Sequence, residues 1–239
     1  MVRLAIGSGR GVWLGAGALL IAGGLWAGMH FGWWSRDGAG RPVTESPPYF
    51  VGRAACAECH AAQLATWAGS DHDRAMDVAT DATVLGNFEN ARFTHSGVTS
   101  EFFRRDGRFI VHTDGPDGEL ADFEIRYVFG VDPLQQYLIE MPDGRLQTLS
   151  ITWDSRPKEK GGQKWFHMYP NEFVPHGDEL HWTGPQQNWN YQCAECHSTN
   201  LQRSYDAKTR RHSATWSEID VSCETCHGPS SEHVRVCQA

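Results

Sequence analysis

Two short stretches in the middle of the chain alternate between apolar and polar positions. Aromatic or aliphatic residues occupy every second position of 123–129 and of 149–153. A period of two is typical of half-buried β-strands. Gly, Pro and Asp residues at 114–118 and 142–144 supply the chemistry of tight turns between such strands. We therefore predict a small antiparallel β meander inserted at about residues 91–154.

The rest of the chain shows short or irregular patterns. Residues 54–68 have a composition compatible with a helix, and Gly69 follows as a terminator. From Trp165 onward the chain is rich in His, Trp, Asn and Pro and has little periodicity. Short elements of this kind are expected where side chains pack around a bound group rather than around one another.

The N-terminus has the pattern of a targeting segment. Arg3 and Arg10 precede an uncharged stretch from Gly11 to Trp34, which is about long enough to cross a bilayer as a helix. Basic residues on the N-terminal side predict that the remainder of the chain is exported. We interpret residues 1–36 as an N-terminal membrane anchor, with a cleaved signal sequence as the alternative.

A polar linker and one domain follow this segment. Residues 37–48 contain Gly, Pro and Ser without periodicity, and the domain is predicted to span residues 49–239. The formal net charge of the whole chain is −8. Binding to a phosphate backbone requires concentrated Lys and Arg, so this balance argues against a nucleic-acid partner.

Six of the seven cysteines lie in three copies of one motif. The chain reads CAECH at 56–60, CAECH again at 193–197 and CETCH at 223–227. In a CxxCH motif the two cysteine sulfurs can bond to the vinyl groups of haem, and the histidine becomes the proximal iron ligand. The predicted attachments of three c-type haems are Cys56, Cys59 and His60; Cys193, Cys196 and His197; and Cys223, Cys226 and His227.

Zinc sites and redox-active dithiols also use CxxC pairs. Neither chemistry needs a histidine directly after every second cysteine. A tetrahedral zinc site uses two CxxC pairs, so one of the three pairs would be left unused. Only 25 residues separate His197 from Cys223, whereas 132 separate His60 from Cys193. We therefore expect the second and third haems to be neighbours and the first to be brought to them by the fold.

Further ligands are required if each iron has two. Candidates outside the motifs are eight histidines and two methionines: His72, His95, His112, His167, His176, His181, His212, His233, Met76 and Met168.

Two of these histidines lie in patterns that resemble a known family. The stretch CAECHAAQLATWAGSDH ends at His72, and CETCHGPSSEH ends at His233. Both are similar to elements of the multihaem cytochrome family that includes the cytochrome c-554 and c-prime (c-552/4) domain. The resemblance covers about residues 49–236 and implies that His72 and His233 are distal iron ligands, often of a haem other than the one bound by the preceding motif.

The chain also departs from that pattern. Ser230 stands where the family usually has a second glycine, and three motifs are present where four haems are common. The segment WNYQCAECHSTN is similar to longer exported multihaem proteins that continue into further CxxCH motifs and tetratricopeptide repeats. This predicts that the chain is the N-terminal part of such a protein, in which Cys237 is an unpaired thiol or the start of a further element.

The sequence thus predicts an α+β protein. It has an N-terminal transmembrane helix and a multihaem cytochrome domain of short helices and loops around haems, with the β meander inserted, on the periplasmic or extracytoplasmic side of a membrane. Bis-histidine haems have no open site, so the leading hypothesis is electron transfer between redox partner proteins such as quinol-oxidising enzymes or other cytochromes, with no catalytic residue assigned.

Two alternatives remain open. A five-coordinate haem could reduce or oxidise a small nitrogen or sulfur compound, with His112, Arg126 or His176 as proton donors. The segment from Ala91 to Asp154 could instead bind a partner, which would make the protein a sensor or scaffold.

Overall fold

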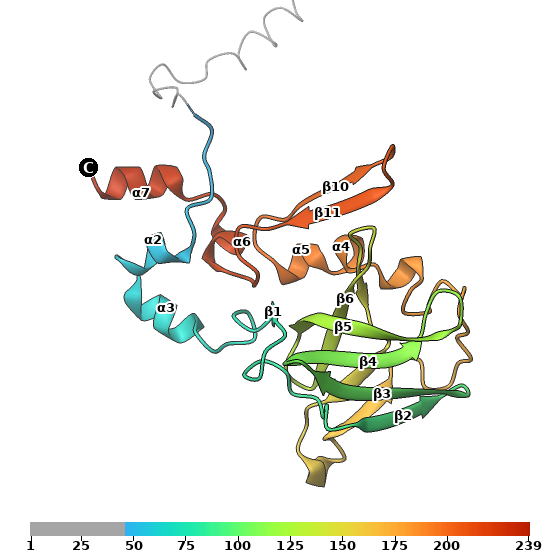
Figure 1. The fold of residues 1–239 in the computed structure, drawn as a ribbon. Coiled ribbons are helices and arrows are strands. Elements are labelled where there is room, and N and C mark those ends of the chain that lie inside the picture. The colour runs from blue at the N-terminus through green and yellow to red at the C-terminus, as the bar shows by residue number, and fades with distance from the viewer. Residues whose placement is uncertain (1–45) are drawn as a thin grey trace, which may run out of the picture. The chain divides into compact units, whose positions relative to one another are not determined.

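The computed structural model describes residues 46–239 (Figure 1). The predicted anchor at 1–36 and nearly all of the predicted linker lie outside the described residues. One nine-stranded antiparallel sheet forms the largest part of residues 48–239. Its strands are β1 (Met76–Val78), β2 (Ala91–His95), β3 (Val98–Arg105), β4 (Arg108–Asp114), β5 (Leu120–Phe129), β6 (Leu134–Glu140), β7 (Leu146–Thr148), β8 (Ile151–Asp154) and β9 (Lys164–His167).

The strands follow the order β2-β3-β4-β5-β6-β8-β9, while β1 pairs with β5 and β7 pairs with β6. Most neighbours in this order are also consecutive in the chain, as expected for a meander joined by tight turns. The predicted turns at 114–118 and 142–144 are confirmed, and Gly118 and Gly144 both have positive φ angles. The two alternating stretches lie in β5 and around β8, although β8 is buried along its whole length.

Aromatic side chains fill the interior of the sheet. Phe102 and Trp165 stack with ring centroids 3.7 Å apart, and Phe88 packs edge-on against both. A second apolar cluster around Met76, Leu138 and Trp189 joins the sheet to the helices that follow it.

The two strands at the ends of this order, β2 and β9, come together. The ring of His95 at the end of β2 stacks on the ring of His167 at the end of β9, with centroids 3.9 Å apart. Because β2 and β9 are the two ends of the strand order, the sheet curls until its ends touch. We call this contact the seam.

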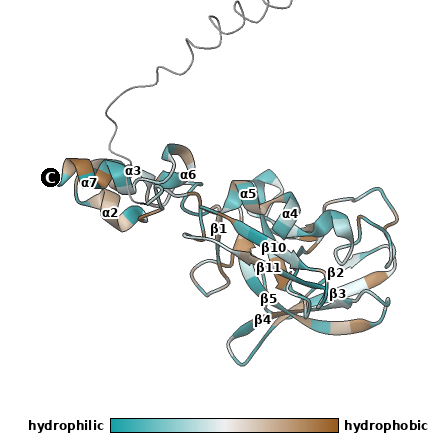
Figure 2. Cartoon of the chain, turned by 90° about the horizontal axis from the view of Figure 1, so that it is seen from above, coloured by the Kyte–Doolittle hydropathy of each residue, from teal (hydrophilic) through white to brown (hydrophobic). Residues whose placement is uncertain are grey.

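The helices are few and short. They are α2 (Arg53–Ala57), α3 (Ala61–Trp67), α4 (Trp189–Gln192), α5 (Ala194–His197), α6 (Cys223–His227) and α7 (Ser231–Cys237), with 3-10 turns η1 (Lys158–Lys160) and η2 (Pro185–Gln187). Both figures place α2, α3, α6 and α7 together at one end, away from the sheet (Figures 1 and 2). We call this group the motif end.

A hairpin of β10 (Gln202–Asp206) and β11 (Arg211–Thr215) lies between the second and third cysteine motifs. The backbone N–H of His212 donates to the carbonyl of Asp143, and the Arg211 guanidinium donates to the carbonyl of Pro142. A Cβ on Gly144 would lie 2.1 Å from the His212 carbonyl oxygen, so this close approach requires glycine.

The predicted fold class is wrong. Short helices and loops do not form the body of the domain with a small meander inserted. The nine-stranded sheet is the body, and it begins before residue 91 and ends after residue 154. The error has a physical cause, because β1, β7 and β9 are only three or four residues long and a period of two cannot be recognised over that length.

The predicted membrane location is also corrected. Among the helices of residues 46–239, none is long and apolar enough to cross a bilayer. The segment on which that prediction rested lies outside the described residues. The described residues therefore do not bear out the prediction of a periplasmic domain held by a membrane helix.

Candidate functional site

The first cysteine motif interrupts a helical segment. Cys56 lies in α2, and the chain then turns so that the backbone N–H groups of Cys59 and His60 both point to the Cys56 carbonyl. His60 is the N-cap residue of α3. The helix ends before Gly69, whose φ angle is 78°. The predicted helix over 54–68 is therefore two short helices with the motif at their junction, and Cys59 and His60 are exposed.

The third motif lies beside the first. Cys223 begins α6, and its side chain lies near that of Cys56 in the lining of one cavity. Burial, and secondarily the neighbouring Cys223, raises the pKa of Cys56. Two motifs that are separated by more than 160 residues in the chain thus lie close together at their first cysteines.

Glu224 holds this meeting in place. Its carboxylate is 1% exposed and accepts the backbone N–H groups of Val51, Gly52 and Ser230 at 2.8–3.1 Å. One buried charge therefore ties the start of α2, the third motif and the start of α7 together. Ser230 adopts a φ of −99°, which any residue can adopt, so the family's second glycine is not needed here.

A cavity of about 700 Å³ opens between these elements. Its lining comes from the first and third motifs and from α7: Ala55, Cys56, Cys59, His60, Gln63, Cys223, His227, Pro229, Ser230, His233, Val234, Cys237 and Gln238. The volume lies within the range typical of sites for organic cofactors. This cavity, which we call the motif cavity, brings together two predicted proximal histidines and one predicted distal histidine.

His60 and His233 face each other across the motif cavity. Their ring centroids are 6.2 Å apart, and the ring planes differ by 26°. Metal to imidazole bonds of about 2.0–2.1 Å place the centroids of two rings on opposite sides of one metal ion roughly 6 Å apart. The residues present therefore fit a haem that is attached through Cys56 and Cys59 and ligated on both faces.

The second motif belongs to the sheet side of the molecule. Cys193 follows α4, Ala194 is fully buried, and His197 ends α5. His197 Nδ1 donates a hydrogen bond to the carbonyl of Ala75 at 2.9 Å. Because a carbonyl only accepts, the proton lies on Nδ1 and leaves Nε2 as a metal ligand, which is the usual arrangement of a metal-binding histidine. Burial raises the pKa of Cys193.

The loop that carries His72 connects the second and third motifs. The His72 carbonyl accepts the N–H of Val221, two residues before Cys223, and Ala75 at the end of the same loop accepts from His197. The side chain of His72 is exposed. The third motif is also linked directly to the second, because Thr225 and Thr199 share a hydrogen bond of 2.7 Å.

An ionic cluster fixes α2 against this loop. The Arg53 guanidinium contacts Glu218 at 2.7 Å, Asp220 at 2.8 Å and Asp73 at 3.5 Å. Burial raises the pKa of Asp220, and the hydrogen bond from Arg53 offsets only part of this effect. The Arg53 side chain also lies over the Trp67 ring at 4.6 Å.

Sequence reasoning missed the residues that position the motifs. Glu224 and Thr225 lie inside the CETCH motif at positions that haem attachment leaves free, and Arg53 precedes the first motif by three residues. A carboxylate directly after the first cysteine, at a position that haem attachment leaves free, is the sequence signal that could have identified Glu224. The candidates His95, His167, His176 and His181 are not near the motif cavity; they line a different cavity in the sheet.

The family model described as cytochrome c554 and c-prime matches residues 55–95 and 155–228. The two matched segments contain all three CxxCH motifs and His72, and they omit strands β3 to β8. No curated protein and no solved structure matches the chain. The match and the geometry of the motifs agree: the chain carries a c-type cytochrome domain, whose cofactor is covalently bound haem c.

Proposed function

We propose that the chain is an electron-transfer protein with three covalently attached c-type haems. Haem attached in this way supplies one-electron exchange at its iron. The attachments are Cys56 and Cys59, Cys193 and Cys196, and Cys223 and Cys226, with His60, His197 and His227 as proximal ligands.

The observation that carries the proposal is the pairing of His60 with His233 across the motif cavity. An iron with two imidazole ligands has no open position for a substrate, so exchange of electrons is the chemistry that remains. His233 is therefore assigned to the haem attached through Cys56 and Cys59, not to the haem of the preceding motif. The short α7 helix serves to present His233 to that cavity.

His72 is proposed as a second distal ligand. Its backbone is bonded to the segment just before Cys223, and its loop also reaches His197. The side chain is exposed, so it is free to rotate toward either neighbouring motif. Its loop is the element best placed to serve a haem other than that of the preceding motif.

The contacts between motifs suggest the order in which electrons pass. The third motif touches the first through Cys223 and Cys56, and the second through Thr225 and Thr199. The haem of the third motif would then lie between the other two. Other cytochromes or quinol-oxidising enzymes are the proposed donors and acceptors.

Electron paramagnetic resonance and visible absorption of the oxidised, haem-loaded protein test this function. Mass spectrometry should first find three covalent haems. Only low-spin iron signals would support an electron carrier. A high-spin signal from one iron in three that shifts on adding nitrite, hydroxylamine or peroxide would instead support the alternative of an enzyme that acts on a small nitrogen compound.

Single substitutions test the ligands. Changing His233→Ala should convert one haem to high spin while the number of covalent haems stays at three, and His72→Ala should do the same for a second haem. His112→Ala is the matched control, because His112 lies in β4 and bonds to Asp122. An unchanged low-spin spectrum in either variant would remove that histidine from the ligand set.

A further inference from the structure

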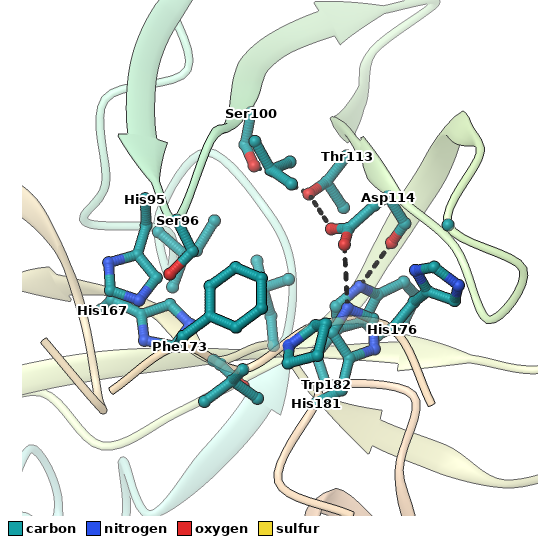
Figure 3. A pocket seen from close by; sticks show the side chains of 17 residues that line it. His95, Ser96, Ser100, Thr113, Asp114, His167, Phe173, His176, His181 and Trp182 are labelled. Carbon is teal, nitrogen blue, oxygen red and sulfur yellow. Dashed lines mark hydrogen bonds and ion pairs between the residues drawn. The ribbon is translucent and has the colours of Figure 1, made fainter. Parts of the chain in front are cut away.

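A second cavity of about 270 Å³ lies at the seam of the sheet, apart from every CxxCH motif (Figure 3). Side chains from β2, β4, β8 and β9 and from the loop that follows β9 form its walls. Four of them are histidines outside the proposed ligand set: His95, His167, His176 and His181. We call this space the seam cavity.

One wall of the seam cavity is a buried chain of hydrogen bonds. Ser100 and Thr113 share a bond of 2.7 Å, and the Thr113 hydroxyl donates to Asp114 at 3.2 Å. Nε2 of His181 donates to the Asp114 carboxylate at 3.1 Å, and its Nδ1 accepts the backbone N–H of Thr183. Buried polar groups cost free energy even when they are paired, so a network of this kind in the interior of a sheet indicates a use other than packing.

The hydrogen bonds of the stacked His95 and His167 rings determine which ring nitrogens remain available to accept a hydrogen bond. His95 Nε2 donates to the carbonyl of Glu172 at 3.2 Å, which leaves its Nδ1 as an acceptor in the neutral ring. His167 Nδ1 accepts the N–H of Tyr169 at 3.1 Å. Burial, and secondarily the neighbouring His95, lowers the pKa of His167 to about 4. The His167 ring is therefore uncharged near neutral pH.

The charge of the lining is negative. Asp114 is the only carboxylate among the lining residues, and the lining contains no Lys or Arg. Burial works to raise the pKa of Asp114, but the hydrogen bond and the charge interaction with His181, followed by the hydrogen bond from Thr113, outweigh it and hold the pKa below its usual value. Two of about four acceptor positions on this carboxylate are used by those side chains, and the others remain.

Aromatic and aliphatic side chains complete the lining. Phe173 is 72% exposed, whereas Trp182, Leu149 and Val174 are buried. Figure 3 shows the Phe173 ring between the His95 and His167 pair and the Asp114 side chain. Such rings attract cations through their faces and also accommodate an apolar body.

We propose that the seam cavity binds a small primary ammonium ion with a short apolar body. The ammonium group offers three N–H donors to the open acceptor positions of the Asp114 carboxylate, and the rings of Phe173 and Trp182 lie on the same lining for the apolar body. An anion would be repelled by the Asp114 carboxylate, and a neutral molecule would gain no charge attraction from it. Among residues 46–239, no three His, Cys, Asp or Glu side chains are arranged to hold a metal ion.

Calorimetric titration of the haem-loaded protein at pH 8 tests the proposal with three probes of one shape. Isobutylammonium should bind in a saturable 1:1 manner, isobutanol at least tenfold more weakly, and isobutyrate more weakly still. Asp114→Asn keeps the shape of the side chain, removes its charge and should lower the affinity for isobutylammonium at least tenfold. Asp106→Asn, which makes the same charge change at an exposed turn, should leave the affinity unchanged.

A second variant keeps the test valid if Asp114→Asn does not fold. Phe173→Ala removes the exposed ring of the lining and leaves the Asp114 network intact, and it should weaken the binding of isobutylammonium several-fold. The proposal is overturned if isobutylammonium fails to bind at millimolar concentration or binds no better than isobutanol. Equal binding by wild type and by both folded variants would also overturn it.

Discussion

The motif end and the sheet are held together in different ways. Helices α2, α3 and α7 contain no buried residue. The sheet instead buries two apolar clusters, with Phe102, Tyr137 and Leu138 fully inaccessible to solvent. The side chains of the chain thus fill the interior of the sheet, whereas the motif end surrounds a cavity of about 700 Å³.

This difference shows where a bound group contributes to the fold. Helices of five to seven residues are far below the length at which an isolated helix is stable. Their packing partner must therefore be something other than one another. Haem attached to Cys56, Cys59, Cys223 and Cys226 would supply the apolar surface that the sheet obtains from its own aromatic residues.

The largest effect should come from removing the third attachment. A Cys223→Ser, Cys226→Ser double variant should lose one covalent haem by mass spectrometry. Because α7 lines the motif cavity and has no buried residue of its own, its backbone amides should also lose protection in hydrogen exchange. The amides of β3, β4 and β5 should keep theirs, since their core lies elsewhere.

The contrast between the motif end and the sheet would be refuted if the amides of the sheet and of α7 lost protection from hydrogen exchange together. That outcome would mean that residues 48–239 unfold as one cooperative unit and that the haems stabilise the sheet as well. Cys237→Ser is the control, because Cys237 lines the same cavity but lies outside every motif.

The next effect concerns the sheet alone. Phe102→Ala removes a fully buried ring that stacks on Trp165, and losses of about 3–5 kcal/mol in the free energy of unfolding are typical of such changes. The haem count and the low-spin spectrum should not change. Phe103→Ala is the control, because Phe103 lies on the opposite face of β3 and is only partly buried.

The strands could be predicted where they were long and alternating. Residues 120–129 form β5 because the period of two there is continuous and turn residues precede it. The short strands β1 and β9, which lie outside the predicted meander, could not be predicted, because such strands are placed by contacts between distant residues, such as His95 with His167 across more than 70 residues. Periodicity predicts local structure, but it does not predict which strands of a sheet will come into contact.

The candidate site shows the same limit. The nine motif residues could be named from the spacing alone, since the chemistry of attachment is local. Their arrangement could not, because it depends on Glu224 accepting hydrogen bonds from residues 172 and 173 positions away. Short separation along the chain suggested that the second and third motifs were neighbours, whereas the third motif contacts both others.

A smaller effect should follow from Glu224→Gln. The variant keeps the side-chain shape but loses the charge that accepts the N–H groups of Val51, Gly52 and Ser230. Hydrogen bonds to a charged group contribute about 1.5–3 kcal/mol each, so these three amides should exchange faster. Glu195→Gln, at an exposed carboxylate of the second motif, should leave exchange unchanged. Equal exchange in both variants would mean that haem packing alone positions α2 and α7.

The smallest expected effect is a pH dependence of the free energy of unfolding that arises from His167 at the seam. The pKa of His167 is about 4 in the folded protein, below its ordinary value of 6.5, because burial and His95 disfavour the charged ring. Its neutral form therefore contributes stability that is fully present above pH 6.5 and is lost as pH falls from 6.5 toward 4, where only the unfolded chain binds the proton.

Denaturant titrations of wild type and His167→Gln at pH 7.5, 6 and 5 measure this effect. The free energy of unfolding of the wild type should fall relative to the variant by less than about 1.4 kcal/mol per pH unit, the limit for one proton, because the half-exposed ring is partly screened. His112→Gln tests a histidine on the same sheet that lies away from the seam. A parallel pH dependence of wild type and His167→Gln would show that the seam tolerates a charged ring, and the stacked pair would then be held by the surrounding strands and not by its own neutrality.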